Sequence, residues 1–413
     1  MRIAGITAEY NPLHSGHKYH IRKTREIAQA EAIITLISSN FTQRGEPSMV
    51  DKHARARMAV SCGADLALEL PCAFSCRNAG IFADAAIDIF GATGAVGVIS
   101  FGTESGDEKK ILFERCADIL NGEPAEFKSA LKKFLGIGHS FVQSRSMALD
   151  ELAPGALELL STPNNNLAMA YIKRIREKKH PMETLHIRRI GAGFHERDTS
   201  ESDVASASAI RGLIASGGAR AANAFLPSPC EEILRGEIEA GHAVIGREKL
   251  WRAVRQMALR ASPEELADIA EMREGLENRM RRAAYEAASM DEFVDICTSR
   301  RYPTGRIQRY CAHLLLNLRQ EQSKKFQENG PAYIRVLAAN ETGREILRAM
   351  RKTATLPVLS KPGGKMSRYA WEIMSFERAA SEIWETLTES PRQNAESRIF
   401  QTLSPRDFPS GRQ

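Results

Sequence analysis

Three histidines lie within seven residues near the start of the chain, in the sequence NPLHSGHKYH (residues 11–20). They are His14, His17 and His20, and the whole chain contains only ten histidines. An imidazole N–H can donate a hydrogen bond to a phosphate oxygen as negative charge develops there during displacement at phosphorus. Gly16 has no side chain and allows the backbone to approach a nucleotide closely. We therefore interpret the stretch as a phosphate-binding segment with His14 and His17 as catalytic groups.

A structural interpretation of these histidines stays open beside the catalytic one. A single histidine near a helix start more often caps the helix or packs against it. His20 lies one helical turn after His17, on a similar face, and either supports the reactive histidines or belongs to the helix packing.

A second polar stretch, residues 38–60 (SSNFTQRGEPSMVDKHARARMAV), also follows an apolar run. Its amide, guanidinium and ammonium groups can bind a triphosphate or a second substrate. Arg55 fits a binding role and an ordinary helix face equally well, whereas Arg57 better fits a solvated face. The candidates for binding phosphate or a second substrate are Gln43, Arg44, Glu46 and Lys52, with Glu46 orienting one of the cations.

The elements that must position these residues can be predicted from apolar periodicity. Buried parallel strands are predicted over residues 3–8, 32–37, 66–70 and 96–101, and another strand is predicted over 184–190. Helices are predicted between the first four strands, over residues 17–30, 51–62 and 78–90. This alternation is typical of a doubly wound α/β fold with a parallel sheet. The histidine stretch then lies at the carboxyl end of the first strand, where such sheets bind ligands and a helix start favours phosphate.

The character of the chain changes after about residue 227. Long helices rich in Ala, Arg, Glu and Leu are predicted, for example over 247–261 and over 263–288, which opens with the cap sequence SPEE. We predict an α/β catalytic domain over residues 1–220, a mainly α-helical domain over 228–390, and a polar, poorly ordered tail over 391–413.

Composition excludes several classes of protein. The chain of 413 residues has a net charge of +6, which permits an anionic partner without requiring one. It contains no apolar run long enough to cross a membrane and no signal-peptide pattern, so we expect no membrane partner and a cytoplasmic location. Seven cysteines show no paired spacing. Cys72 and Cys76 are expected to be core thiols, and no metal site is predicted in the protein itself.

A resemblance to a known family extends over most of the chain. HSGH alone resembles the nucleotide-binding signature of class I aminoacyl-tRNA synthetases and adenylyltransferases. Longer blocks, in the same order, are similar to the bacterial tRNA(Met) cytidine acetate ligase family: AEYNPLHSGHKYH, SSNFTQRGEP, GADLALELP, FGTESGD, STPNNNLAMAYIKRI, RRIGAGFHE, SASAIR, RRYPTGRIQRY and PAYIRVLA. The resemblance implies a nucleotidyltransferase (HUP-like) domain followed by the helical domain.

The resemblance also implies an activity. ATP would activate acetate as acetyl-adenylate with release of pyrophosphate, with Mg²⁺ bridging phosphates of the leaving group. The acetyl group would then pass to N4 of the wobble cytidine, position 34, of elongator tRNA(Met). ATP and acetate are thus the expected substrates and this tRNA the expected partner.

The ATP-binding residues implied by the resemblance are a run near the start of the chain, Gly102, Asn164, and the pair Arg189 and Ile190. Gly102 permits close approach of adenine or ribose, Asn164 presents a donor and an acceptor, and Arg189 counters phosphate charge. Ile190 would supply an apolar wall. Ser206 and Ser208 of SASAIR resemble a second phosphate-side motif, although plain helix capping explains them equally well. The run near the start of the chain consists of Thr7, Ala8, Glu9, Tyr10, Asn11, Pro12, Leu13, His14, Ser15, Gly16, His17, Lys18, Tyr19 and His20.

The sequence departs from the family pattern at three positions beside the reactive residues. Leu13 stands where an aromatic residue is usual, Ser15 where Asn is common, and Asn166 where an aliphatic residue is usual. These differences affect the expected pocket shape more than the reaction type.

The RNA partner is expected to bind a basic region downstream. Residues 300–325 carry seven Lys and Arg against one acidic residue, with Tyr302 and Tyr310 between them for base stacking. A second basic helix follows around residues 344–352. A solvated helix face is the alternative interpretation. The tRNA-binding candidates are Arg300, Arg301, Arg306 and Arg309.

Two other functions stay open at this point. An adenylyltransferase acting on a small phosphorylated metabolite would use the same first loop but would need no basic helical half. A non-catalytic RNA-binding protein with a degenerate nucleotide fold would not need HSGH. The sequence identifies neither the oligomeric state, nor the general base for acetyl transfer, nor the acetate contacts.

Overall fold

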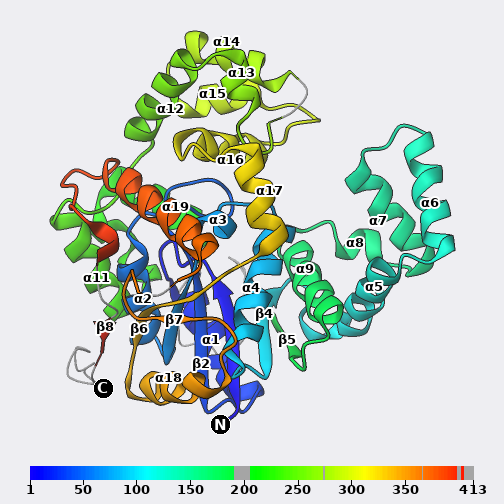
Figure 1. The fold of residues 1–413 in the computed structure, drawn as a ribbon, viewed down its shortest axis with the longest axis horizontal. Coiled ribbons are helices and arrows are strands. Elements are labelled where there is room, and N and C mark those ends of the chain that lie inside the picture. The colour runs from blue at the N-terminus through cyan, green and yellow to red at the C-terminus, as the bar shows by residue number, and fades with distance from the viewer. Residues whose placement is uncertain (190–204, 273–274, 365, 398–400, 404–413) are drawn as a thin grey trace.

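The computed structural model describes residues 1–189, 205–272, 275–364, 366–397 and 401–403, so the predicted ATP-binding residue Ile190 lies outside the described residues. One eight-stranded sheet occupies its centre (Figure 1). Along the sheet the strands run in the order β5-β4-β1-β2-β3-β6-β7, and β8 pairs with β6. The strands are β1 (Ile3–Ala8), β2 (Ala32–Ser38), β3 (Leu66–Leu70), β4 (Val98–Thr103), β5 (Glu183–Arg188), β6 (Ile334–Ala339), β7 (Val358–Leu359) and β8 (Gln401–Thr402).

The first five strands are parallel, which confirms the predicted doubly wound α/β fold. The chain passes from β1 to β2 and β3 in one direction and then returns to the other side of β1 for β4. The strand order therefore reverses between β1 and β4. In open α/β sheets this switch point leaves a crevice at the carboxyl ends of the strands. Residues that follow Ala8 and Phe101 lie at that crevice.

Successive residues of a strand point to opposite faces of the sheet, and both faces of this sheet are apolar. Helices therefore cover both faces. Ile33 and Ile37 of β2 belong to one buried cluster, whereas Ile34 and Leu36 belong to the other. The first cluster includes residues of α1 (Ser15–Ile27), α2 (Lys52–Ser61), α10 (Ala207–Gly217) and α11 (Ser228–Glu239). The second includes residues of α3 (Cys72–Ser75), α4 (Ala79–Thr93), α9 (Pro163–Lys178), α18 (Glu341–Thr353) and α19 (Arg368–Glu385).

Two groups of helices extend from this core in different directions (Figure 1). The first group projects at the side of α9 and contains α5 (Lys110–Gly122), α6 (Ala125–Gly136), α7 (Phe141–Leu152) and α8 (Ala156–Leu159). The second group, which we call the helical part, contains α12 (Glu248–Arg260), α13 (Pro263–Ala267), α14 (Leu276–Glu286), α15 (Met290–Cys297), α16 (Thr304–Leu315) and α17 (Gln320–Asn329). Three 3₁₀ helices complete the elements: η1 (Gly106–Lys109), η2 (Ala219–Phe225) and η3 (Ala395–Ser397).

The C-terminal third of the chain contributes to the sheet as well as to the helices. The strand β6, which lies within the predicted helical domain, pairs antiparallel with β3. Its six residues are all buried. The division at residues 220 and 228 stays a prediction, but residues on both sides of it share this one sheet.

Two predictions about the C-terminal region were wrong in detail. The helix predicted over 263–288 is divided into α13 and α14, and Glu271 and Gly275 between them have positive φ angles, which end a helix. The predicted tail is ordered where it begins, because Arg392 pairs with Asp51 and Glu396 is 2 % exposed.

All seven cysteines are free and buried, Cys72 and Cys76 among them.

In the described ranges, no helix combines the length and the apolar character that crossing a membrane requires.

Candidate active site

The histidine segment joins β1 to α1 through a reciprocal cap. His14 is the residue before the first turn of α1, and its Nδ1 accepts a hydrogen bond of 3.1 Å from the backbone N–H of Gly16. The backbone N–H of His14 in turn donates to Nδ1 of His17 at 3.3 Å. These bonds satisfy donors at the helix start that have no partner within the helix. The cap therefore fixes both rings at the switch-point crevice.

The cap also determines which nitrogen carries the proton. Because Nδ1 of each ring accepts a hydrogen bond, a neutral ring must carry its proton on Nε2. Burial, and then the charge of Arg189, lowers the pKa of His14 to about 4. Burial, and then the neighbouring His14, holds the pKa of His17 well below its ordinary value. At neutral pH both rings are thus neutral, and each can still donate a hydrogen bond from Nε2–H to a phosphate oxygen.

His20 belongs to the packing of α1 on the sheet. Its Nε2 lies 3.0 Å from the hydroxyl of Ser100 on β4, and the same hydroxyl lies 2.6 Å from Thr24. Burial, followed by the charge of Arg189, lowers the pKa of His20 to about 4. The Tyr10 ring meets His17 edge to face, with 5.0 Å between ring centroids. His20 thus joins α1 to β4, and Tyr10 contacts the ring of His17.

Gly102 and Arg189, 87 positions apart in the sequence, are brought together at the ends of β4 and β5. The backbone N–H of Arg189 donates to the carbonyl of Thr103 at 2.9 Å. A Cβ atom added at Gly102 would lie 3.0 Å from Cγ of Arg189. The exposed Arg189 side chain therefore lies over the glycine, and its charge acts on the three histidines.

Asn164 lies beside the same strand end and holds an acidic residue that was not predicted. Its side-chain amide donates to Glu104 at 2.6 Å, and the hydroxyl of Thr162 donates to the other carboxylate oxygen at 2.8 Å. Asn165 accepts a bond of 3.2 Å from the backbone N–H of Glu104. Glu104 follows Gly102 in the block FGTES, so its place after a predicted strand was the signal that could have identified it.

Comparison with known proteins shows to which family the chain belongs. The sequence model described as HIGH Nucleotidyl Transferase matches residues 1–398. The tRNA(Met) cytidine acetate ligase of Syntrophomonas wolfei subsp. wolfei is 35% identical over 97% of this chain and 99% of its own length. The enzyme of the same name from Thermoanaerobacter sp. is 35% identical, over 87% of this chain and 89% of its own length. The crystal structure of Thermotoga maritima TmcAL bound with alpha-thio ATP superimposes with a TM-score of 0.89 at 30% identity, covering 98% of this chain and all of that one.

The chain belongs to the tRNA(Met) cytidine acetate ligase family.

A turn after β2, residues 42–47, lies next to the histidine segment in this family member; we call it the QRGE turn. The backbone N–H of Gln43 donates to the Glu9 carboxylate at 2.8 Å. Burial raises the pKa of Glu9, and the Gln43 bond and the Arg44 charge oppose that rise. Arg44 is exposed and remains a phosphate candidate. Glu46, predicted to orient a cation of this stretch, pairs with Arg211 and Arg247 from other parts of the chain.

Lys52 was predicted to bind phosphate or a second substrate, and the structure places it elsewhere. Its side chain is 1% exposed and forms ion pairs with Glu69, Glu377 and Glu396. The Glu377 pair measures 2.6 Å. An ammonium group enclosed by three carboxylates has no free face for a triphosphate. The sequence could not show this, because the glutamates come from β3, α19 and η3.

Arg55 is also structural in this conformation. It is fully buried and donates to the carbonyls of Glu9 at 2.7 Å and Ser39 at 2.8 Å. Its guanidinium therefore links the residues that follow the carboxyl ends of β1 and β2.

The serines of SASAIR support the capping interpretation. The Ser206 hydroxyl accepts from the backbone N–H of Ala209 at 3.2 Å and starts α10. Ser208 accepts from Arg211 at 3.3 Å. Arg211, which was not selected from the sequence, donates to the carbonyl of Asn11 at 2.9 Å and so ties α10 to the histidine segment.

The four basic tRNA candidates divide into two pairs. Arg300 and Arg301 are exposed. Arg306 instead donates to the Tyr310 hydroxyl at 2.6 Å and lies over the Tyr302 ring. Arg309 lies 3.5 Å from the carboxylate of Glu271 and is 15% exposed.

The predicted stacking role of the two tyrosines was wrong. Tyr302 is 7% exposed and Tyr310 is fully buried. Their rings pack with Arg306 inside the helical part, so neither presents a face on which a base could stack.

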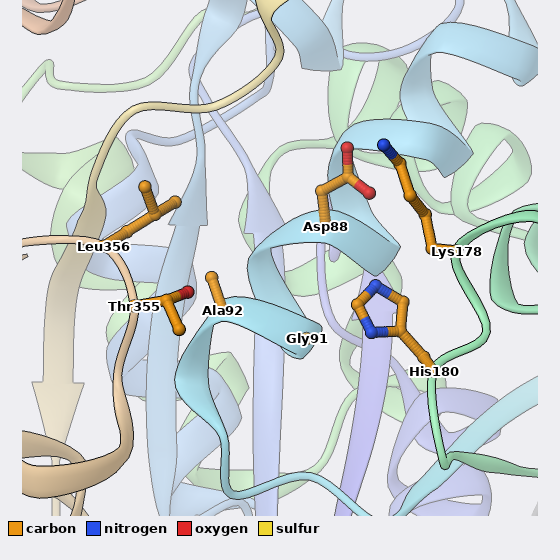
Figure 2. Close-up of a pocket in the computed structure, with 7 residues that line it drawn as sticks. All are labelled: Asp88, Gly91, Ala92, Lys178, His180, Thr355 and Leu356. Atoms are coloured by element: carbon orange, nitrogen blue, oxygen red, sulfur yellow. The ribbon is translucent and has the colours of Figure 1, made fainter.

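A separate cavity lies at the opposite end of the sheet (Figure 2). Its residues come from the end of α4, the end of α9 and the segment before β7; α4 and α9 lead into the amino ends of β4 and β5. It is lined by Asp88, Gly91, Ala92, Lys178, His180, Thr355 and Leu356. None of these is a predicted site residue, and the cavity is distinct from the crevice described above.

Proposed function

We propose that this chain activates acetate with ATP and transfers the acetyl group to N4 of the wobble cytidine, position 34, of elongator tRNA(Met). The observation that carries the proposal is the reciprocal cap of His14 and His17 at the switch-point crevice, which uses Nδ1 of both rings and leaves Nε2 for a ligand. The family relatives named for this reaction, and the ATP analogue named in the Thermotoga maritima structure, support it.

The first step forms acetyl-adenylate. An acetate oxygen attacks the α-phosphorus of ATP, a P–O bond forms, and the bond to pyrophosphate breaks on the opposite side. His14 and His17 donate hydrogen bonds to the phosphate oxygens on which charge increases. Arg189 adds positive charge next to them, and Gly102 leaves room for the nucleotide.

Mg²⁺ would neutralise phosphate charge when it binds together with ATP. The described residues gather three carboxylates only around Lys52, which already occupies them. Mg²⁺ commonly binds through substrate phosphates and one or two carboxylates. Glu104, whose two oxygens are held in place by Thr162 and Asn164, is the residue at the crevice that fits this requirement.

The second step joins the acetyl group to RNA. The cytidine amine attacks the carbonyl carbon of the mixed anhydride, a C–N bond forms, AMP leaves, and the nitrogen loses a proton. The amine is a weak nucleophile, so alignment supplies much of the rate. Arg300 and Arg301 are the exposed cations proposed to bind the tRNA backbone.

A single experiment tests the proposal. The purified protein is incubated with ATP, Mg²⁺, labelled acetate and total tRNA, and the digested RNA is examined for labelled N4-acetylcytidine. We expect the label in that nucleoside and its loss in the His17→Ala variant. Acetate-dependent pyrophosphate release without labelled RNA would contradict the acceptor, and the absence of both signals would contradict the adenylation chemistry.

A further inference from the structure

Glu46 connects three separate parts of the molecule through one carboxylate. One of its oxygens lies 3.0 Å from the guanidinium of Arg211 on α10. The other lies 3.3 Å from the guanidinium of Arg247, directly before α12. The side-chain amide of Gln308 on α16 donates to that same oxygen at 3.3 Å. The carboxylate is therefore the common partner of α10, α12 and α16.

On the nucleotide side, this connection reaches the histidine segment. Arg211 donates to Glu46 and, through its other terminal nitrogen, to the carbonyl of Asn11 at 2.9 Å. Asn11 lies three residues before His14, the cap of α1. The QRGE turn also binds Glu9 of this segment through the backbone N–H of Gln43. Arg211 and Gln43 hold this segment through bonds of their own, so the segment keeps these contacts when the Glu46 carboxylate is changed.

On the other side, the connection reaches the helical part. Arg247 also pairs with Asp291 at the start of α15. The neighbouring Gly45 has a φ angle of +83°, and a Cβ atom added there would lie 2.4 Å from the backbone nitrogen of Arg309 on α16. The QRGE turn therefore packs directly on the α16 backbone. Backbone packing and the Glu46 carboxylate are two independent contacts between the same parts.

The location of Glu46 between the histidine segment and the helical part suits a role beyond stability. Adenylation needs only ATP, acetate and the histidine segment. Acetyl transfer also needs an RNA base placed at the adenylate while the RNA lies against the basic helical part, and small errors in such alignment greatly reduce rates. We propose that Glu46 is a positioning residue for acetyl transfer, which sets the helical part against the histidine segment. This inference rests on the proposed function.

The test separates the two steps in the full chain. Glu46→Gln keeps the shape of the side chain and removes its charge. We expect the acetate-dependent ATP–pyrophosphate exchange rate and the KM for ATP to stay within about twofold of the wild type, because the histidine segment is intact. Single-turnover transfer from enzyme-bound acetyl-adenylate to saturating tRNA should fall roughly tenfold to a hundredfold.

Two further variants make the test independent of the folding of Glu46→Gln. Arg247→Gln removes one of the two Glu46 partners on the helical side, together with the pair to Asp291, and should give the same selective loss. The double variant should lose little more than either single variant, since both remove one interaction. Glu177→Gln is the matched control: Glu177 also pairs with two cations, Arg174 at 3.1 Å and Lys173 at 3.8 Å, but on α9 alone. It should leave both steps unchanged.

The outcomes are distinct. Equal losses in both steps, or an unchanged transfer rate in Glu46→Gln and Arg247→Gln, would overturn the positioning role. A wild-type protein that forms no acetyl-adenylate, or transfers none of it to tRNA, would refute the proposed function before any variant is compared, and the inference would fall with it.

Discussion

The ring centroids of His14 and His17 lie 3.9 Å apart, and the backbone N–H of the first residue donates to Nδ1 of the second. The same two residues cap α1 and face the crevice between β1 and β4. Because capping uses Nδ1 in both rings, only Nε2–H is left to interact with a ligand. The structural and the catalytic interpretations of these histidines are therefore compatible.

The first prediction separates capping from catalysis at His14. Asparagine is a favoured N-cap residue, so His14→Asn should keep the free energy of unfolding within about 0.5 kcal/mol of the wild type. It removes the Nε2–H donor, and the rate of acetyl-adenylate formation should fall roughly 10²- to 10³-fold. His14→Ala should show the same catalytic loss and lose about 1 kcal/mol of stability in addition. Pyrophosphate exchange and urea unfolding measure the two effects, and a wild-type exchange rate in His14→Asn would rule out the proposed donor.

The second prediction concerns pH. Burial lowers the pKa of His20 in the folded protein to about 4, below its value of 6.5 in the unfolded chain. Between these values the unfolded chain binds more protons, so stability falls as the pH decreases from 6.5 towards 4. His20→Gln removes one titrating group and should reduce this pH dependence, measured as the free energy of unfolding at several pH values. Identical pH dependence in the two proteins would show that the His20 pKa is not lowered.

The third prediction contrasts two cations of the same polar stretch. Lys52→Met leaves Glu69, Glu377 and Glu396 buried without their ammonium partner and should destabilise the fold by about 3–5 kcal/mol. Arg44→Met changes an exposed side chain and should alter stability by less than about 0.5 kcal/mol. If Arg44 binds phosphate, its variant should raise the KM for ATP. Chemical unfolding and the KM for ATP check both parts, and equal stability losses would argue against the buried cluster.

The fourth prediction tests the RNA surface. Arg300→Glu and Arg301→Glu should weaken tRNA binding and reduce its dependence on salt concentration, while adenylation remains. Arg2→Glu, at the amino end of β1 and paired with Glu183, serves as the control and should bind tRNA normally. Binding isotherms at two or more salt concentrations provide the measurement. The same weakening in all three variants would indicate a general charge effect and not a binding surface.

The fifth prediction concerns Gly102. In Gly102→Ala the added methyl group would meet Cγ of Arg189 at 3.0 Å, and the Arg189 side chain must shift to make room for it. We expect the KM for ATP to rise roughly tenfold, equivalent to about 1.4 kcal/mol, with a smaller change in stability. Steady-state kinetics and a thermal melt test this. An unchanged KM would mean that Arg189 does not hold ATP from this position.

Much of the nucleotide-binding half could be predicted from local patterns. A continuous apolar run bounded by polar residues is typical of a buried parallel strand, and β1, β2 and β3 were located to within one residue. The strand β4 begins two residues later than predicted. The first helix begins at Ser15, two residues before the predicted start, because a histidine served as its cap.

Long-range partners account for what the sequence did not reveal. A lysine just after a strand looks the same whether it faces a phosphate or a buried carboxylate, and only the fold brings Glu377 and Glu396 to Lys52. Tyr302, Arg306 and Tyr310 at spacings of four read as a basic, aromatic face. Tyr302, which precedes α16, and Tyr310, which lies on it, are both buried, and the Arg306 guanidinium lies over both rings.

The pairing of β3 with β6 has a consequence for the synthesis of the chain. Leu66 is the register partner of Ala339, so one edge of β3 remains unpaired until most of the polypeptide has left the ribosome. At about 5–20 residues per second this takes tens of seconds. Exposed edges readily pair with other chains. The nascent protein therefore depends on its last third to cover this edge of β3. A fragment that ends near residue 220 would keep an exposed strand edge that can pair with other chains.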